Sequence, residues 1–136
     1  MNYLLDTNIC SYIIRQKPQV VLQKFQALAA GDVAVSAITV AELQYGVAKS
    51  QQPERNQIAL YQFLAPLVIL PFTEETAVFY GNLRAQLEKN GSPIGALDTL
   101  IAAHALAERL ILITNNQREF ARVPGLQVEN WVDETT

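Results

Sequence analysis

Short apolar runs alternate along the whole chain with stretches in which apolar residues recur three or four positions apart. The short runs end at polar or turn-forming residues, which is typical of buried strands. They predict strands at 2–5, 33–36, 67–70, 110–113 and 127–129. The intervening patterns predict helices up to 15 and over 18–31, 39–49, 53–64, 73–89, 96–109 and a short stretch to about 122. This alternation predicts a three-layer α/β domain with a mostly parallel sheet flanked by helices.

The helix expected at 96–109 differs from the others because it has almost no polar face. A helix that is apolar all round is normally buried. We therefore expect this helix to lie against the sheet. His104 lies six positions after Asp98, about 240° around the helix, so we interpret it as a structural histidine.

Composition favours one domain, residues 1–136, with one active site, since the chain shows no linker and no repeat. Hydrophobic residues make up 50% of the chain and charged residues 17%. This apolar share indicates buried helices, a buried subunit interface, or both, and we expect a homodimer.

No apolar run approaches the about 20 residues that a helix needs to cross a bilayer. The first residues also lack the basic and apolar segments of a secretory signal. We expect a cytoplasmic protein with no membrane association.

Cys10 and His104 are the only residues of their kinds, which excludes an intramolecular disulfide, a thiolate zinc cluster and a histidine-rich metal site. Any metal must then be held by oxygen, which points to Mg²⁺, with Mn²⁺ as a substitute. The net charge of −3 argues against a protein that coats nucleic acid, but not against a nuclease, because catalytic carboxylates contribute to that charge.

Three acidic residues stand where the predicted strands end or the next helices begin: Asp6, Glu42 and Asp98. Ligands of parallel sheets bind outside the carboxyl ends of the strands. Each acid also has a structural explanation: Asp6 as a helix N-cap, Glu42 in a capping box with Thr39, and Asp98 in a favourable helix dipole. Capping does not explain why all three gather at one edge. Carboxylates about 4 Å apart repel by roughly 4 kcal/mol per pair at an effective dielectric near 20, and a divalent cation relieves that repulsion.

Four segments together resemble the PIN-domain ribonucleases, and most closely the VapC toxins of bacterial toxin–antitoxin pairs. They are LLDTN at 4–8, TVAELQYG at 39–46, PIGALDTLIAAHA at 93–105 and ITNNQREF at 113–120. The resemblance implies a PIN-like fold, homodimerisation, inhibition by a VapB-like antitoxin, and Mg²⁺-dependent endonucleolytic cleavage of RNA, often tRNA. It also implies that Asp6, Asp98 and Glu42 hold the metal, with Thr7 and Thr114 positioning the carboxylates or a metal-bound water.

The fourth acidic position of many family members is Asn116 here, with Glu119 one helical turn later. Two interpretations stay open for this pair. Asn116 and Glu119 form a capping box, or they complete the catalytic site together with the three acids. Arg118 and Arg122 beside them are candidate phosphate contacts, although a solvated helix face is the default explanation for either one alone.

Two non-catalytic classes also stay open. A phospho-receiver signalling module holds Mg²⁺ at strand ends, but it needs an acidic pair after its first strand and a late lysine, and no lysine follows Lys89. A PIN-like scaffold that binds RNA without cutting it is the other alternative.

Overall fold

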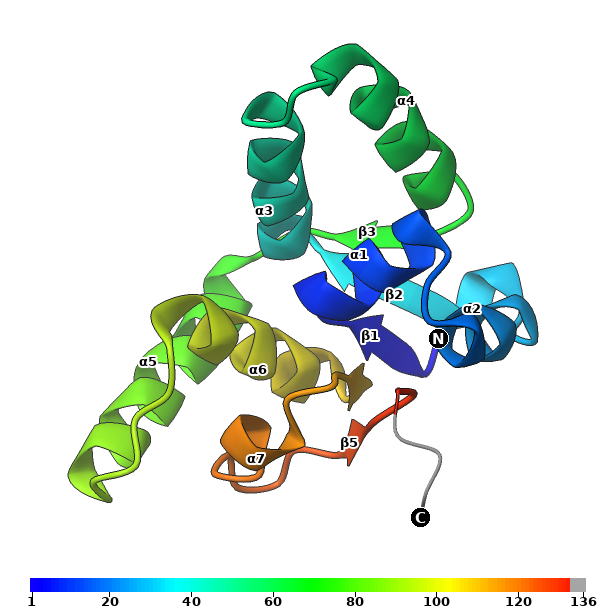
Figure 1. Ribbon diagram of the computed structural model, residues 1–136. Coiled ribbons are helices and arrows are strands. Elements are labelled where there is room, and N and C mark those ends of the chain that lie inside the picture. The colour runs from blue at the N-terminus through cyan, green and yellow to red at the C-terminus, as the bar shows by residue number, and fades with distance from the viewer. Residues whose placement is uncertain (133–136) are drawn as a thin grey trace.

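The computed structural model describes residues 1–132, which fold around one five-stranded sheet in the order β3-β2-β1-β4-β5 (Figure 1). All neighbouring strands are parallel. The strands are β1 Tyr3–Leu5, β2 Val33–Ser36, β3 Val68–Leu70, β4 Ile111–Ile113 and β5 Val128–Glu129. The five predicted strands and the parallel sheet are confirmed.

The helices follow the predicted order. They are α1 Thr7–Arg15, α2 Gln19–Gln26, α3 Ala37–Ala48, α4 Pro53–Leu64, α5 Glu74–Lys89, α6 Ala96–Glu108 and α7 Gln117–Phe120, with a 3-10 turn η1 at Ala30–Asp32. Most boundaries lie within one or two residues of the prediction, and two of the differences have a clear structural cause. Helix α2 ends at Gln26 rather than near residue 31, and the chain turns through η1 into β2. Helix α3 begins two residues before the expected Thr39, because the Ser36 hydroxyl accepts a hydrogen bond from the Ile38 N–H and caps the helix there.

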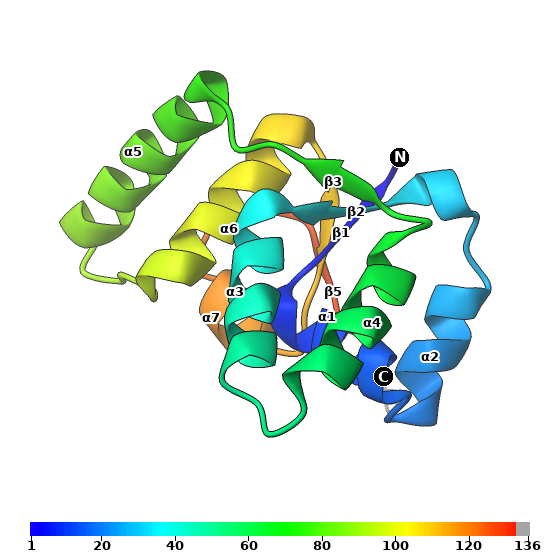
Figure 2. The same cartoon turned by 90° about the horizontal axis from the view of Figure 1, so that it is seen from above.

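The sheet has a hydrophobic core on each face, because successive strand residues point to opposite sides. Leu4 lies in the core that includes residues of α5 and α6, and its neighbour Leu5 lies in the core that includes residues of α1, α2 and α4. Figure 2 shows these two groups of helices on either side of the strands. The three-layer architecture is therefore confirmed.

Helix α6 is buried in its middle, where Ile101 to Ala105 are inaccessible or nearly so, whereas Leu97 in its first turn is 48% exposed and Glu108 at its end is exposed. His104 is fully buried, and its Nδ1 lies 2.7 Å from the Ser36 Oγ. This pair ties α6 to the end of β2. His104 thus has the structural role predicted for it.

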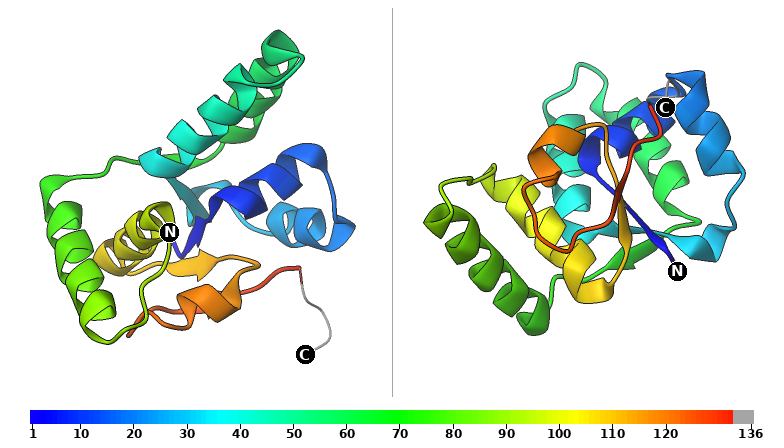
Figure 3. Two further views of the ribbon diagram at one scale, coloured as in Figure 1. Left: turned by 60° about the vertical axis from the view of Figure 1, so that its left-hand side comes forward. Right: turned by 90° about the horizontal axis from the view of Figure 1, so that it is seen from below.

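Helices α3 and α4 form a hairpin that extends away from the sheet (Figure 3). Three large side chains on it are exposed to solvent: Tyr45, Ile58 and Tyr61. In the described part of the chain, none of the helices combines the length and apolar character that a membrane span requires.

Candidate active site

The carboxyl ends of β1, β2 and β4 meet at one edge of the sheet, and the polar residues that follow them meet there too. Asp6 follows β1, the central strand, and is only 7% exposed. Its Oδ1 accepts a hydrogen bond from the Ile9 N–H at 2.9 Å, so Asp6 does cap α1. Asp6 therefore caps a helix and also lies at the edge of the sheet where ligands bind.

The pKa of Asp6 is raised, chiefly because burial penalises the charged carboxylate. Hydrogen bonds from the Thr114 hydroxyl and the Ile9 N–H lower it in part, and the nearby charge of Glu42 raises it further. Thr114 directly follows β4, so it links the central acid to the neighbouring strand.

Glu42 lies in α3 and reaches the same edge. The Thr7 hydroxyl donates a hydrogen bond to its Oε1 at 2.7 Å. The capping box considered for Thr39 and Glu42 is wrong, because α3 starts at Ala37 and Thr39 lies inside the helix. Glu42 is therefore positioned by α1 and not by a capping role.

Asp98 stands in the first turn of α6 and is half-buried. Burial raises its pKa to about 7, with further contributions from a hydrogen bond and the charge of Glu119 and from the charges of Asp6 and Glu42. The structure therefore brings together all three predicted metal ligands and adds Glu119 as a fourth acid. The Asp98 carboxyl, with its pKa of about 7, is therefore partly protonated near neutral pH.

Glu119 lies in α7, and its two oxygens have different partners. Its Oε1 accepts the Gly95 N–H at 2.9 Å, and its Oε2 accepts the Asn116 Nδ2 at 2.5 Å. The Gly95 N–H is the main reason that the pKa of Glu119 is lowered, and the Asp98 hydrogen bond adds to it. The capping-box alternative for Asn116 and Glu119 is wrong, because α7 has no side-chain N-cap bond and the Asn116 N–H donates to the Thr114 Oγ1.

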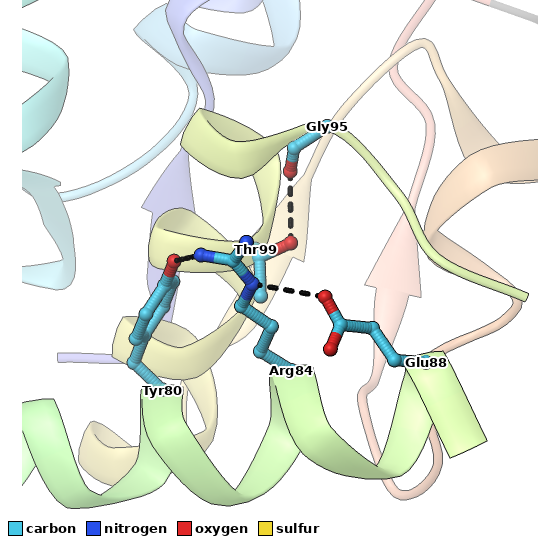
Figure 4. Close-up of polar contacts among 5 residues, drawn as sticks. All are labelled: Tyr80, Arg84, Glu88, Gly95 and Thr99. Atoms are coloured by element: carbon cyan, nitrogen blue, oxygen red, sulfur yellow. Dashed lines mark hydrogen bonds and ion pairs between the residues drawn. The ribbon is translucent and has the colours of Figure 1, made fainter. Parts of the chain in front are cut away.

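The loop that leads into α6 is held by a hydrogen bond from the turn after α7. Arg122, in the turn after α7, donates to the Pro93 carbonyl at 3.0 Å, so this arginine holds the loop; Arg118 is exposed. On α5, Arg84 donates to the Tyr80 hydroxyl and to Glu88, so these bonds stay within that helix (Figure 4).

Sequence reasoning missed the roles of Gly95 and Arg122. The Thr99 hydroxyl also bonds the Gly95 carbonyl at 2.8 Å (Figure 4), so Gly95 uses both of its backbone groups. A backbone donor leaves no side-chain pattern, and the only signal was the loop's position next to Asp98.

Besides burial, the charges of Glu119, Asp6 and Glu42 raise the pKa of Asp98, and three of the four carboxylates accept a hydrogen bond from a protein donor. Within residues 1–132, no group of three or more His, Cys, Asp or Glu side chains is arranged to hold a metal ion. Asp6 faces Ile9, Glu42 faces Thr7 and Glu119 faces Gly95.

A groove of about 450 Å³ lies next to this acidic cluster, between α1, α3 and α4. We call it the α1–α3–α4 groove. Its lining includes Thr7, Asn8, Arg15, Glu42 and Asn56. Glu42 therefore belongs both to the acidic cluster and to a depression that opens toward solvent.

The family model of the PIN domain matches residues 3–126. The chain belongs to the PIN-domain family. The resemblance to PIN-domain proteins that the four sequence segments indicated is thus confirmed.

Among relatives of this PIN-domain chain, ribonuclease VapC2 of Haemophilus influenzae is 49% identical over 132 residues, covering 97% of this chain and 99% of the relative. The tRNA(fMet)-specific endonuclease VapC of Shigella flexneri is 42% identical, covering 96% of this chain and 98% of the relative. Within the family, the chain groups with the VapC ribonucleases.

Solved structures show the same similarity. The toxin–antitoxin complex VapBC2 of Rickettsia felis, bound to a promoter DNA fragment, contains a chain with a TM-score of 0.90 and 46% identity, covering 96% of this chain and 99% of that one. The DNA-bound VapBC of Salmonella typhimurium contains a chain with a TM-score of 0.91 and 38% identity, covering 96% of this chain and 98% of that one. The PIN-like fold is therefore confirmed.

Neutralising Asp98 is expected to stabilise the metal-free protein. Since the folded-state pKa of Asp98 is about 7 against a usual 3.8, the stability it contributes is full below about pH 3.8 and is lost as pH rises to 7. Asp98→Asn should therefore raise the melting temperature at pH 8 in EDTA by about 3–5 °C, a modest gain because Asp98 is half-exposed. Scanning calorimetry at pH 5 and 8 tests this.

The gain in melting temperature should shrink at pH 5. The control variant Glu75→Gln, which removes an exposed acid elsewhere, should show no gain. An equal gain of Asp98→Asn at both pH values contradicts the proposed repulsion.

Proposed function

We propose that this PIN-domain protein is the toxin of a toxin–antitoxin pair and acts as a Mg²⁺-dependent endoribonuclease on tRNA in the cytoplasm. The observation that carries the proposal is the meeting of Asp6, Glu42, Asp98 and Glu119 at one sheet edge, where their charges and burial raise the pKa of Asp98 to about 7. So much negative charge is costly unless a cation balances it.

The donors at this edge suit a hard divalent cation, since all of them are carboxylate or hydroxyl oxygens. Asp6 and Asp98 would hold Mg²⁺ directly, and Glu42 would be a further ligand or would orient the attacking water. When bound, Mg²⁺ supplies activation of a water molecule and neutralises charge on the phosphate that is cleaved.

The chain's own residues position these groups. Thr7 fixes Glu42 through the 2.7 Å hydrogen bond, which directs this carboxylate toward the groove where it accepts a proton from the attacking water. Thr114 bonds Asp6, and the Gly95 N–H holds Glu119 beside Asp98. Glu119 adds negative charge next to Asp98 and supports a second, weaker cation.

The substrate class is supported by the Shigella flexneri relative, which is named for tRNA(fMet) and is 42% identical over 131 residues. We propose that this chain also cleaves tRNA. A single strand with an accessible backbone, as in a tRNA loop, fits an open groove beside the carboxylates better than a duplex.

The proposed inhibitor is a VapB-like antitoxin, as supported by the VapBC complexes among the similar structures. An antitoxin segment that crosses the α3–α4 hairpin would cover exposed Tyr61 and Ile58, which line a separate depression on α3 and α4, and would bring an Arg or Lys toward Glu42 in the neighbouring α1–α3–α4 groove. We also propose a homodimer, in which a second copy covers exposed apolar residues of α5 and the start of α6, such as Phe79 and Leu97.

Removing any one of the three predicted ligands should abolish cleavage. Asp6→Ala, Glu42→Ala and Asp98→Ala should each slow cleavage of labelled tRNA(fMet) by at least about a hundredfold, because each loses a cation ligand or the water-orienting group. Cleavage is measured on denaturing gels, with excess EDTA as a parallel treatment and circular dichroism to check folding.

Glu75→Gln is the matched control, since it removes an exposed acid far from the cluster and should cleave at the wild-type rate. Full activity in excess EDTA would refute the metal-dependent mechanism. RNA binding without cleavage by the wild-type chain would instead support the non-catalytic RNA-binding alternative.

The role of Glu119 can be separated from its structural bonds. Glu119→Gln keeps an oxygen that accepts the Gly95 N–H but loses the charge beside Asp98. It should raise the Mg²⁺ concentration for half-maximal cleavage by several-fold, about tenfold if a full charge–cation contact is lost. A titration of initial rates against Mg²⁺ measures this, and an unchanged midpoint would leave a site of three carboxylates.

The antitoxin and dimer proposals can both be tested on the purified protein. Tyr61→Asp should weaken inhibition by the antitoxin encoded next to this chain by at least about tenfold, because a charge is introduced into an apolar contact, while tRNA cleavage is unchanged. Inhibition assays and sedimentation velocity at micromolar concentration measure both. A monomer in sedimentation, or unaltered inhibition of Tyr61→Asp, would contradict the respective proposal.

A further inference from the structure

The end of α1 carries a second depression, about 780 Å³ in volume and lined by Tyr12, Arg15, Lys17 and Pro18. We call it the α1 hollow. Arg15 also lines the α1–α3–α4 groove, so the two depressions adjoin at this side chain. Figure 3 shows the turn between α1 and α2 on the side of the molecule away from α5. The hollow is thus an extension of the groove that contains Glu42.

The Arg15 side chain and the Lys17 backbone are both held by local contacts at the end of α1. The Arg15 guanidinium carbon lies 5.3 Å from the centroid of the Tyr12 ring, and its Nε donates to the Ser11 carbonyl. The Lys17 N–H donates to the Tyr12 carbonyl at 3.0 Å, after Gln16 takes a left-handed conformation at φ 59°. Both side chains therefore project from a fixed turn.

Neither cation is neutralised by its surroundings in residues 1–132, because the ion pairs found there involve only the N-terminus with Asp32 and Arg84 with Glu88. Arg15 and Lys17 are also exposed. In a chain with a net charge of −3, two adjacent cations without an acidic partner at the end of an acidic groove form a local anion-binding surface.

The hollow is also connected to the acidic cluster through the sheet. The Tyr12 hydroxyl accepts a hydrogen bond from the Asn115 Nδ2 at 2.8 Å. The Asn115 Oδ1 is buried and has no hydrogen-bond partner among the described residues. Asn115 directly follows Thr114, whose hydroxyl bonds Asp6. A ligand in the hollow is therefore fixed relative to the residues that would cut it.

We propose that the α1 hollow binds one nucleotide of the RNA strand, a few nucleotides from the bond that is cleaved. Arg15 and Lys17 bind its phosphate, and the exposed Arg15 guanidinium on Tyr12 provides a surface on which the base stacks. Nine residues of helix at about 1.5 Å each separate Asp6 from Arg15, so the subsite lies about 14 Å from the acidic cluster. This inference rests on the proposed ribonuclease function.

An RNA strand fits the observations better than an acidic protein segment does. Both would bind the two cations, but only a nucleotide also uses the aromatic and guanidinium surface beside them. The adjoining groove leads to Glu42, where a phosphate must arrive for cleavage. A protein segment is therefore an outcome of the test that would overturn the proposal.

Binding is measured in an Asp98→Asn background with excess EDTA, so that no RNA is cut, by fluorescence anisotropy of a short labelled single-stranded RNA. Lys17→Ala and Arg15→Ala should each weaken binding about tenfold and reduce the salt dependence of log K by about 0.7, the value for one lost phosphate contact on a single strand. Lys24→Ala and Arg55→Ala, which remove the same charges outside the hollow, should change neither quantity.

Three results would overturn the proposal. One is an equal loss of affinity in the control variants, which would indicate diffuse attraction. Another is an unchanged salt slope with a lower melting temperature in Arg15→Ala and Lys17→Gln, which would assign these residues to the end of α1. The last is weaker antitoxin inhibition with unchanged RNA binding, which would assign the hollow to a protein. Cleavage of tRNA by the wild-type chain with Mg²⁺ tests the proposed function separately, since the binding assay needs no cleavage.

Discussion

Repulsion among carboxylates is the constraint on which the rest of this structure depends. Burial alone disfavours the charged forms of Asp6 and Asp98, and their neighbours Glu42 and Glu119 disfavour them further. The repulsion lowers the free energy of unfolding, and burial of apolar side chains in the two hydrophobic cores offsets this loss. The hydrogen bonds from threonine hydroxyls and from a glycine N–H hold the acids together despite their charge.

The parallel sheet makes this concentration possible. Because β1 is central and all strands run in one direction, residues that are dozens of positions apart leave the sheet at the same edge. The buried His104–Ser36 pair and the Arg122–Pro93 hydrogen bond then fix the helices that carry the remaining acids. The helices that carry the acids are thus held rigidly although the carboxylates repel one another, as expected for a preorganised site.

Much of this could be predicted from the sequence. Apolar periodicity predicted every strand and α-helix in order, and the rule that polar residues gather at the carboxyl ends of parallel strands predicted that Asp6, Glu42 and Asp98 lie at one edge. Caps were predicted less well, because Ser36 competes with Thr39 for the start of α3 and the pattern alone does not rank them. The partnership of Asp98 with Glu119 could not be predicted, since it depends on how α7 packs against a loop whose contribution is a backbone N–H.

The pairing of β1 with β4 has a consequence for synthesis of the protein. Tyr3 pairs with Ile111, so the first strand gains this neighbour only after more than a hundred further residues have been made. Glu119 and the loop contact of Arg122 come later still. A growing chain therefore lacks the complete set of acids until its final segment leaves the ribosome, and premature termination anywhere before α7 yields fragments without an assembled site.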